Sequence, residues 1–474
     1  MSATGATGAT VGATADGLVL RGWAVDPSSG REGAAEVAVD DGVLARLTWL
    51  SGADADGLGP EGTLILPGLV DLHAHFREPG NEDAETIATG LAAAAHGGFT
   101  TVCLMPNTTP AIDEVSVLAR VLAAAAASGS PVRALVHGAV TTGRHGDTLA
   151  AMGELADAGV VGFSDDGSPV RSAAVLRNAL AYAGALGLPI VDHPEDPSLT
   201  EGAEASEGYV ATVLGLKGWP VAAEAGSVAR SIAILADVIR DVPGTRLHLT
   251  HVSTAASLDH VRAAKTAGLP VTCDVTPHHL AFSDEWVAGA RRWAWQALDA
   301  DGRARDPWAD GALVAGPFDP SVRVNPPLRS PEDAAACLAA LRDGTADAIA
   351  TDHAPHTEVD KHVEFGWAIN GISGIETALG VVLAAVAAGG VPLARAVAAL
   401  TTGPAAVLGP RGGVAPGLRA GEPADLVVVD AGAAWTVTAD GLASKGKNTP
   451  LLGRELPGVV RLVLAGGRVA YTEG

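Results

Sequence analysis

The chain has 474 residues, 48% of them apolar, so it exceeds one ordinary domain and can bury a large core. Its formal net charge of −23 argues against binding to nucleic acids or to anionic membrane surfaces. The three cysteines lie in separate apolar segments and the first basic residue is Arg21, so we expect buried free thiols, no secretory signal and a soluble cytoplasmic protein.

The two ends of the chain share a β-rich pattern. Residues 1–17 are a repetitive Ala/Thr/Gly stretch, for which we expect a disordered tail. Residues 18–66 contain short alternating apolar segments separated by turn residues, a pattern typical of a small antiparallel sheet, and a similar pattern returns in residues 405–474. We therefore predict one small β-sandwich domain built from both chain ends.

Residues 67–404 alternate short apolar strands with Ala-rich helical stretches, which predicts repeated βα units. Helices are expected at 85–96, 115–127, 173–186 and 228–241, and a buried helix is expected within 377–394, ending at Gly389 and Gly390. Eight strands are expected to end near His75, Asn107, Val140, Asp166, His193, His251, Thr276 and Asp352. The pattern predicts an α/β fold, a (β/α)8 TIM-type barrel whose chemistry gathers at the carboxyl ends of the strands.

The first of these strand ends carries a His-x-His pair. Residues 64–70 read as a buried strand, and side chains alternate along a strand, so His73 and His75 face the same side and can grip one metal ion. Arg77 continues the alternation, and its guanidinium suits a substrate with a carboxylate. Ordinary polar residues at a strand end are the simpler reading, but matching ligands elsewhere in the chain favour a metal site.

Further metal ligands stand at other predicted strand ends. The candidates are His73, His75, Asp166, His193, His251 and Asp352. Six ligands exceed the needs of one tetrahedral ion and favour two ions that share a bridge. No lysine precedes His193, so a carboxylated lysine cannot form that bridge there, and one member of the Asp165–Asp166 pair is the candidate in its place. His248 points to the other face of its strand and is expected to be structural.

Several strings together resemble bacterial dihydroorotases of the amidohydrolase superfamily. The strings are DLHAHFREPG from Asp71, GGFTTVCLMPN from Gly97, FSDDG from Phe163, NPPLR from Asn325, ATDHAPH from Ala350 and SKGKNTP from Ser444. The resemblance runs from about residue 18 to the end of the chain. It implies a zinc-dependent enzyme that reversibly interconverts N-carbamoyl-L-aspartate and (S)-dihydroorotate in pyrimidine (UMP) biosynthesis.

The resemblance also implies roles for particular residues. It places His73, His75 and Asp352 on one Zn²⁺ ion and His193 and His251 on a second, with Asp166 and a hydroxide as bridges. Asp352 would be the catalytic residue that carries the proton to the leaving nitrogen. The implied substrate-binding residues are His75, Arg77, Asn107, Asn325, His356, Asn370 and Gly371. A homo-oligomer, a dimer, is expected, and an association with aspartate transcarbamoylase is left open.

This sequence departs from the family pattern in three places. The stretch between His279 and Asn325 is longer and rich in tryptophan (Trp293, Trp295, Trp308), and a subunit contact or a surface excursion is favoured over a lid. Asn370 stands where relatives often have an aromatic residue. Pro194 follows His193 where relatives usually have a small residue or cysteine.

Two other functions are compatible with parts of this pattern. Allantoinases and hydantoinases open similar cyclic amides, but they usually bridge their metals with a carboxylated lysine and their substrates lack the ring carboxylate. A non-catalytic dihydroorotase-like subunit supporting aspartate transcarbamoylase would be expected to have lost ligands, and this chain retains all six. Both features favour dihydroorotase.

Overall fold

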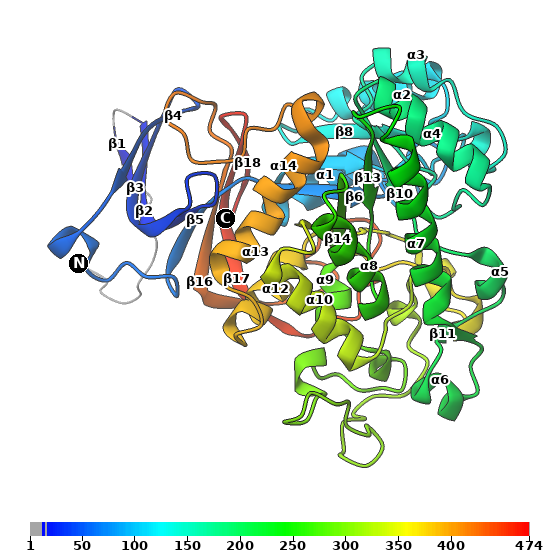
Figure 1. The fold of residues 1–474 in the computed structure, drawn as a ribbon. Helices are drawn as coiled ribbons and strands as arrows, with labels where there is room; N and C mark the ends of the chain where they lie inside the picture. Colours follow the sequence, from blue (N-terminus) through cyan, green and yellow to red (C-terminus); the bar gives the residue numbers. More distant parts are fainter. Residues whose placement is uncertain (1–11, 15–16, 474) are drawn as a thin grey trace.

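The computed structural model describes residues 12–14 and 17–473, which form a barrel with a β domain at its side (Figure 1). The β domain contains β1 Gly12–Thr14, β2 Gly17–Asp26, β3 Arg31–Asp40, β4 Val43–Trp49, β5 Thr63–Pro67, β16 Leu426–Thr436, β17 Glu455–Ala465 and β18 Arg468–Thr472. They form one sheet in the order β18-β17-β16-β5-β2-β3-β4, with β1 on β2. Both chain ends therefore build this domain, as predicted.

The sheet of the β domain folds over its own apolar core. Leu20 and Val37 from its first strands share this core with Leu426 and Leu464 from its last strands. Most strand pairs are antiparallel, and β2 with β5 is the parallel exception. Of the tail expected to be disordered, most lies outside the described residues, but Gly12–Thr14 pairs with β2 as a strand. The expectation of disorder is wrong at that point.

The barrel consists of eight parallel strands, which confirms the predicted fold class. They are β6 Leu69–Ala74, β7 Phe99–Leu104, β8 Arg133–Gly138, β9 Gly162–Phe163, β10 Pro189–Asp192, β13 Arg246–Leu249, β14 Val271–Val275 and β15 Ala348–Ile349. They pair in chain order from β6 to β15. A parallel bridge between Ala74 and His353, with the His75 amide donating to the His353 carbonyl at 2.8 Å, joins the two ends.

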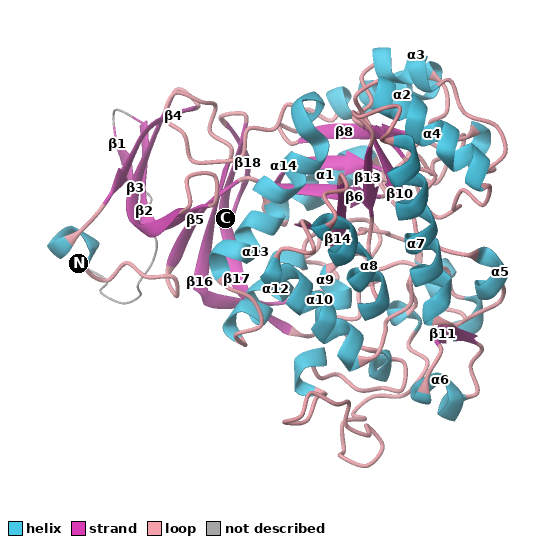
Figure 2. Ribbon diagram, viewed as in Figure 1, coloured by secondary structure: helices cyan, strands magenta, loops and turns pink. Residues whose placement is uncertain are grey.

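Helices surround these strands (Figure 2). The longer ones are α1 Ile87–His96, α2 Val115–Ala127, α3 Met152–Asp157, α4 Ala173–Ala185, α7 Val221–Val238, α8 Ala255–Thr266, α10 Pro331–Asp343, α12 Ala378–Ala387, α13 Leu393–Leu400 and α14 Thr402–Leu408. Short elements in the loops are α5 Pro197–Thr200, α6 Tyr209–Leu214, α9 Pro277–Ala281, α11 Glu358–Lys361 and the strands β11 Ala205–Ser206 and β12 Gly218–Trp219. No helix in the described ranges is long and apolar enough to cross a membrane.

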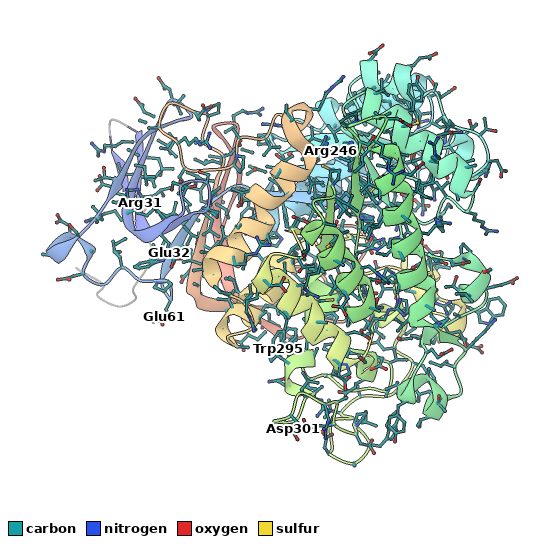
Figure 3. The ribbon with its side chains drawn as sticks, viewed as in Figure 1. Arg31, Glu32, Glu61, Arg246, Trp295 and Asp301 are labelled. Carbon is teal, nitrogen blue, oxygen red and sulfur yellow. The ribbon has the colours of Figure 1, made fainter. Side chains whose placement is uncertain are left out.

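Strands and helices follow from the residue pattern. Strands β6 and β7 are buried along their whole length, as parallel strands covered on both faces are, and their runs are apolar accordingly. Helix α1 begins after Thr86, the N-cap residue, whose side chain accepts from the Thr89 amide. Arg246, at the start of β13, donates to the Val407 carbonyl in α14 and so ties barrel strand to covering helix (Figure 3).

One predicted strand is in fact two. Residues 64–70 were expected to form a single strand, but β5 belongs to the β domain and β6 to the barrel, with a break at Gly68. The Gly68 amide donates to the Asp425 carbonyl at 2.9 Å, and a Cβ on Gly68 would lie 2.2 Å from the Thr100 hydroxyl oxygen. Only a residue without a side chain fits where the chain passes from one sheet to the other.

The tryptophan-rich stretch is not merely a surface excursion. Trp286 is fully buried against the Phe282 ring, and the Trp293 ring stacks with those of Phe282 and Trp295. The guanidinium of Arg454, just before β17, lies 3.6 Å from the Trp293 ring centroid. Trp295 is therefore set against the body of the molecule, whereas Asp301 lies on the loop that projects from it (Figure 3).

Candidate metal centre and active site

His73 and His75 present one ring nitrogen each to the mouth of the barrel. The Nδ1 atom of His73 lies 2.8 Å from the Thr250 hydroxyl, and that of His75 lies 2.8 Å from the Asn107 side-chain oxygen. These contacts orient the rings so that the two Nε2 atoms face each other at 3.2 Å. Such outer contacts commonly fix the orientation and tautomer of metal-binding histidines.

A second pair of histidines faces the first. His193 follows β10 and His251 follows β13, and the Nδ1 of His193 lies 2.9 Å from the Nε2 of His251. The other ring nitrogen of His193 lies 3.0 Å from a Glu195 carboxylate oxygen. His193 is thus held by a carboxylate, as His75 is held by an amide.

Asp166 lies between the two pairs and gives one oxygen to each. Its Oδ2 is 3.4 Å from His73 Nε2 and 3.5 Å from His75 Nε2. Its Oδ1 is 3.2 Å from His193 Nδ1 and 3.3 Å from His251 Nε2. A carboxylate placed in this way could be shared between two ions.

Asp352 completes the first group. Its Oδ1 lies 3.1 Å from His75 Nε2 and 3.5 Å from His73 Nε2. The neighbouring Asp165 is turned away, because its Oδ1 accepts from the amides of Val140 and Thr141. The structure thus brings together the side chains of all six candidate ligands predicted from the sequence, and only one aspartate of the Asp165–Asp166 pair enters the site.

The spacing of these atoms fits zinc. With Zn–N and Zn–O bonds of about 2.0–2.1 Å, two ligands of a tetrahedral ion lie about 3.3 Å apart. The Asp166 contacts of 3.2–3.5 Å match that edge. Two compact groups of possible ligands are present, His73–His75–Asp352 and His73–Asp166–His251; both include His73 and neither includes His193, so they do not separate into the two predicted sets. Imidazole nitrogens facing one another across a carboxylate form a donor set that suits a divalent cation.

The carboxylates of the cluster favour a positive charge beside them, which is shown by the pKa values of the side chains. Burial lowers the pKa of His73, but the Asp166 carboxylate more than offsets this and raises that pKa to about 9. Burial likewise opposes ionisation of Asp166, yet His73, His193 and His251 hold its pKa well below the usual value.

Backbone strain is concentrated in the same place. Arg77, His251 and Asp352 have positive φ angles of 58°, 40° and 47°. Residues with side chains avoid this region, and such strain is typical of sites where the surrounding structure dictates the geometry.

One cavity of about 260 Å³ opens above the cluster. Every site residue predicted from the sequence lines it except His73, which is fully buried beneath. Four of the lining residues come from loops that the barrel strands do not directly place: Asn325, Ile369, Asn370 and Gly371. The cavity therefore joins the metal cluster to the predicted substrate-binding residues.

Arg77 reaches this cavity without an acidic partner. Its Nε donates to the Pro355 carbonyl at 3.1 Å, and its Nη2 lies 3.2 Å from His356 Nε2. Among the residues that the structure describes, no carboxylate forms an ion pair with it. Burial lowers the pKa of Arg77 to about 10, so the guanidinium stays charged at neutral pH and can receive an anion.

Comparisons with known proteins decide the family. The model of the family described as "Dihydro-orotase-like" matches residues 62–257. A protein of Anaeromyxobacter dehalogenans named dihydroorotase is 45% identical, over 95% of this chain and 97% of its own length. One of Pelotomaculum thermopropionicum with the same name is 43% identical, over 96% of this chain and 98% of its own. This chain belongs to the dihydroorotase family.

Solved structures show how widely the fold of this dihydroorotase family member is shared. An L-hydantoinase (dihydropyrimidinase) from Arthrobacter aurescens superimposes with a TM-score of 0.74 at 24% identity, covering 95% of each chain. A dihydropyrimidinase from Brevibacillus agri gives 0.71 at 20% identity, covering 95% of this chain and 94% of the other. Because its relatives named dihydroorotase match it over nearly its whole length, the chain is an enzyme, a hydrolase acting on cyclic amides.

Within this family member, the segment at Gly371 is more constrained than a free substrate contact. The Gly371 amide donates to the Arg323 carbonyl at 2.9 Å, and its carbonyl accepts from Asn448 and Lys361. Asn325 is differently placed, since its buried Oδ1 has no hydrogen-bond partner among the described residues. Asn325 is thus free to accept from a ligand, whereas the Gly371 amide would have to exchange its partner.

Sequence reasoning missed three residues of this site. Glu195 contacts His193 and also accepts from the Asn325 amide at 3.3 Å. Arg144 donates to the Asp166 carbonyl at 2.7 Å from a loop after β8. Lys361 lies behind the cavity wall, where it donates to the Gly371 carbonyl at 3.1 Å. Glu195 could have been predicted from the sequence, because it is a carboxylate two residues after His193. No sequence pattern points to Arg144 or Lys361.

Proposed function

We propose that this chain is a zinc-dependent dihydroorotase that interconverts N-carbamoyl-L-aspartate and dihydroorotate in pyrimidine biosynthesis. The observation that carries the proposal is Arg77, a charged guanidinium without a carboxylate partner, in the cavity that also holds the metal-ligand cluster. A buried cation without a counter-ion is costly, so an anionic substrate group is expected there. The ring carboxylate of dihydroorotate meets that need.

The residues that would hold two zinc ions are His73, His75 and Asp352 for one, and His193 and His251 for the other, with Asp166 shared. Zinc at these positions would polarise the amide carbonyl and promote ionisation of the attacking water. The spacing of the Asp166 oxygens supports a shared ligand. Asn107, Thr250 and Glu195 hold the outer ring nitrogens of three of the histidines and so fix which nitrogen faces inward.

In hydrolysis of the ring, Asp352 would act as the proton carrier. Its Oδ1 lies beside the first histidine pair and its carboxylate lines the cavity. His75 and its neighbours hold the pKa of Asp352 below its usual value, so the carboxylate is ionised and can accept the proton that the attacking water loses. It would then deliver that proton to the ring nitrogen as the C–N bond breaks.

Arg77 and two asparagines would orient the ring. Arg77 can bind the ring carboxylate through two parallel N–H donors, which fixes orientation as well as position. The Asn107 oxygen is engaged by His75, so its amide nitrogen is the group left for the substrate. Asn325 presents an unpartnered oxygen from the facing wall. Together these contacts would place the amide bond over the metal-ligand cluster.

A hydantoinase activity is the second candidate because the fold resembles those enzymes. Two features of the cavity count against it. Asp166 stands where a carboxylated lysine would bridge, and no lysine lines the cavity in the part of the chain that the structure describes. Hydantoin also has no carboxylate for Arg77. These features favour dihydroorotate over neutral cyclic amides.

One assay separates the candidates. Purified protein is incubated with dihydroorotate, N-carbamoyl-L-aspartate, allantoin and hydantoin, each with and without added zinc. We expect turnover of the first two alone, lost on chelation and restored by zinc. Turnover of hydantoin or allantoin without turnover of dihydroorotate would overturn the proposal.

The homodimer and the association with aspartate transcarbamoylase are separate proposals. The mass of the protein in solution, measured alone and after mixing with that enzyme, tests both.

A further inference from the structure

A buried lysine lies behind the wall of the active-site cavity. Lys361, the last residue of α11, is only 5% exposed. Its Nζ donates to three backbone carbonyls: Ile369 at 2.8 Å, Gly371 at 3.1 Å and Arg323 at 3.3 Å. No carboxylate pairs with this ammonium among the described residues.

Burying an unpaired ammonium is unfavourable, so this arrangement calls for a reason. Burial and the nearby Arg323 guanidinium lower the pKa of Lys361 to about 7. The charged form is the one that can donate to three carbonyls at once, because a neutral amine has one donor fewer. The three carbonyls thus act together as the partner of the charge.

The carbonyls belong to two chain segments that line the cavity. One segment leads from Arg323 to Asn325, and the other runs from Ile369 to Gly371. The two segments touch each other, since Gly371 donates to the Arg323 carbonyl and the Arg323 Nε donates to the Asn370 side-chain oxygen at 3.0 Å. Neither segment is a barrel strand, so the barrel does not place them directly.

Other contacts make the Gly371 segment sensitive to small movements. A Cβ at Gly371 would lie 2.7 Å from the Ala354 carbonyl oxygen and 2.8 Å from His356 Nε2. The same His356 nitrogen lies 2.9 Å from the Asn370 carbonyl and 3.2 Å from the Arg77 guanidinium. A shift of Gly371 would therefore reach the group that is expected to bind the substrate carboxylate.

We propose that Lys361 is a positioning residue for the substrate. Through its three carbonyl contacts, Lys361 fixes the distance between the two cavity walls formed by the segments of Asn325 and Gly371. This inference rests on the proposed function for the identity of the substrate. Lys361 does not touch the substrate. It acts through the backbone of the residues that do.

The test compares Lys361→Met with Lys265→Met. Methionine retains the length of the side chain and removes every donor. Lys265 is a matched control, because its Nζ also donates to two backbone carbonyls, those of Gly344 and Thr345, but pairs with Asp347 away from the cavity. For each variant we would measure KM and kcat for dihydroorotate, zinc content and hydrogen exchange of residues 369–372.

Lys361→Met is expected to raise KM for dihydroorotate by about tenfold or more with a smaller change in kcat, since it weakens substrate holding rather than the chemical step. Zinc content should match the parent, and residues 369–372 should exchange faster. Lys265→Met should leave KM and that exchange unchanged. Parental KM and parental exchange in Lys361→Met would overturn the proposal, as would an equal rise of KM in both variants.

Two provisions keep the test decisive. If Lys361→Met does not fold, Lys361→Gln, which retains one donor group, is interpreted in the same way with a smaller expected rise of KM. If the parent does not turn over dihydroorotate, the proposed function fails. Hydrogen exchange at residues 369–372 then still shows whether Lys361 holds this segment.

Discussion

Arg77 combines backbone strain, burial and a missing counter-ion in one side chain. It adopts a positive φ of 58° three residues after the end of β6, the strand that carries His73. Its remaining contacts are to the Pro355 carbonyl and a ring nitrogen of His356, neither of which neutralises it. The charge is therefore available to a ligand, and it discriminates between acidic and neutral cyclic amides.

Arg77→Met is predicted to remove a charge-assisted contact worth about 1.5–3 kcal/mol, or roughly 10- to 150-fold in kcat/KM for dihydroorotate. Zinc content and melting temperature should be nearly unchanged, and a neutral cyclic amide should be handled no worse than by the parent. Arg177→Met, on the exposed face of α4 with Asp237 as its partner, is the control. Intact dihydroorotate kinetics in Arg77→Met would show that this residue does not bind the carboxylate.

Asp166 and Asp165 are adjacent but have separate tasks. Asp166→Ala is predicted to lose zinc, because both histidine pairs lose their shared ligand. Asp165→Asn is predicted to bind zinc normally, since its carboxylate contacts only the segment after β8. Metal analysis after dialysis measures both, and activity should not depend on added bicarbonate. Normal zinc content in Asp166→Ala would rule out the bridge.

Asp352 is both a ligand and the proposed proton carrier, and these two roles can be separated. Asp352→Asn retains an oxygen ligand but cannot accept a proton, so turnover should fall by on the order of a hundredfold or more while much of the metal and the fold remain. Rates would be compared at equal zinc occupancy, with circular dichroism as the check on folding. Near-normal turnover in the metal-loaded variant would exclude the proton-carrying role.

At the scale of elements, Gly68 is the point where the β domain becomes the barrel. It separates β5 from β6 and packs against Thr100 at the second residue of β7. Strand β6 carries His73 at its carboxyl end, so the position of this break sets where the first ligand pair emerges. The glycine matters because another backbone and side chain pass too close for a Cβ.

Gly68→Ala is predicted to lower the free energy of unfolding by about 1–3 kcal/mol, since the new methyl group overlaps Thr100. Gly226→Ala is the matched change within α7, where a Cβ meets nothing within 4 Å, and it should raise stability by roughly 0.5–1 kcal/mol. Denaturant unfolding of both variants and the parent measures the difference. Equal stability of the two variants would contradict the packing argument.

The candidate ligands come from parts of the chain that are far apart in sequence. His73 and Asp352 are separated by most of the barrel in sequence yet lie side by side at its mouth. An ion held between them stabilises the native state, because the unfolded chain has no such site. Metal binding should therefore contribute to global stability as well as to catalysis.

Removal of zinc by a chelator is predicted to lower the melting temperature. At free zinc 100-fold above the dissociation constant, each site contributes about 2.7 kcal/mol. Re-addition of zinc should restore the transition, as seen by calorimetry or circular dichroism. Asp166→Ala serves as the control, since its melting temperature should respond little to the chelator. A parent transition that is indifferent to chelation would argue against a metal centre in the folded protein.

The residue pattern predicted the barrel and the β domain from both ends, and it also picked out six candidate ligands that the structure brings together, whose role as metal ligands stays a prediction. Strand alternation put His73 and His75 on one face, and polar residues at strand ends marked the other ligands, because parallel strands bring their carboxyl ends together. Helix α2 has the predicted bounds, whereas α7 begins seven residues before its predicted start at 228. These successes rest on local patterns.

Only the tertiary structure decided the features that depend on contacts between distant segments. Gly68 interrupts an apolar run that reads as one strand. A glycine is needed at this position because Thr100, in β7, lies too close for a Cβ. Trp286 is buried because Arg454 and neighbouring rings cover a stretch that reads as an excursion. Lys361 meets the Arg323 and Gly371 carbonyls only where two separate loops, 323–325 and 369–371, lie against each other. Such contacts leave no periodic signal, because periodicity reports one element's own burial and not which segment covers it.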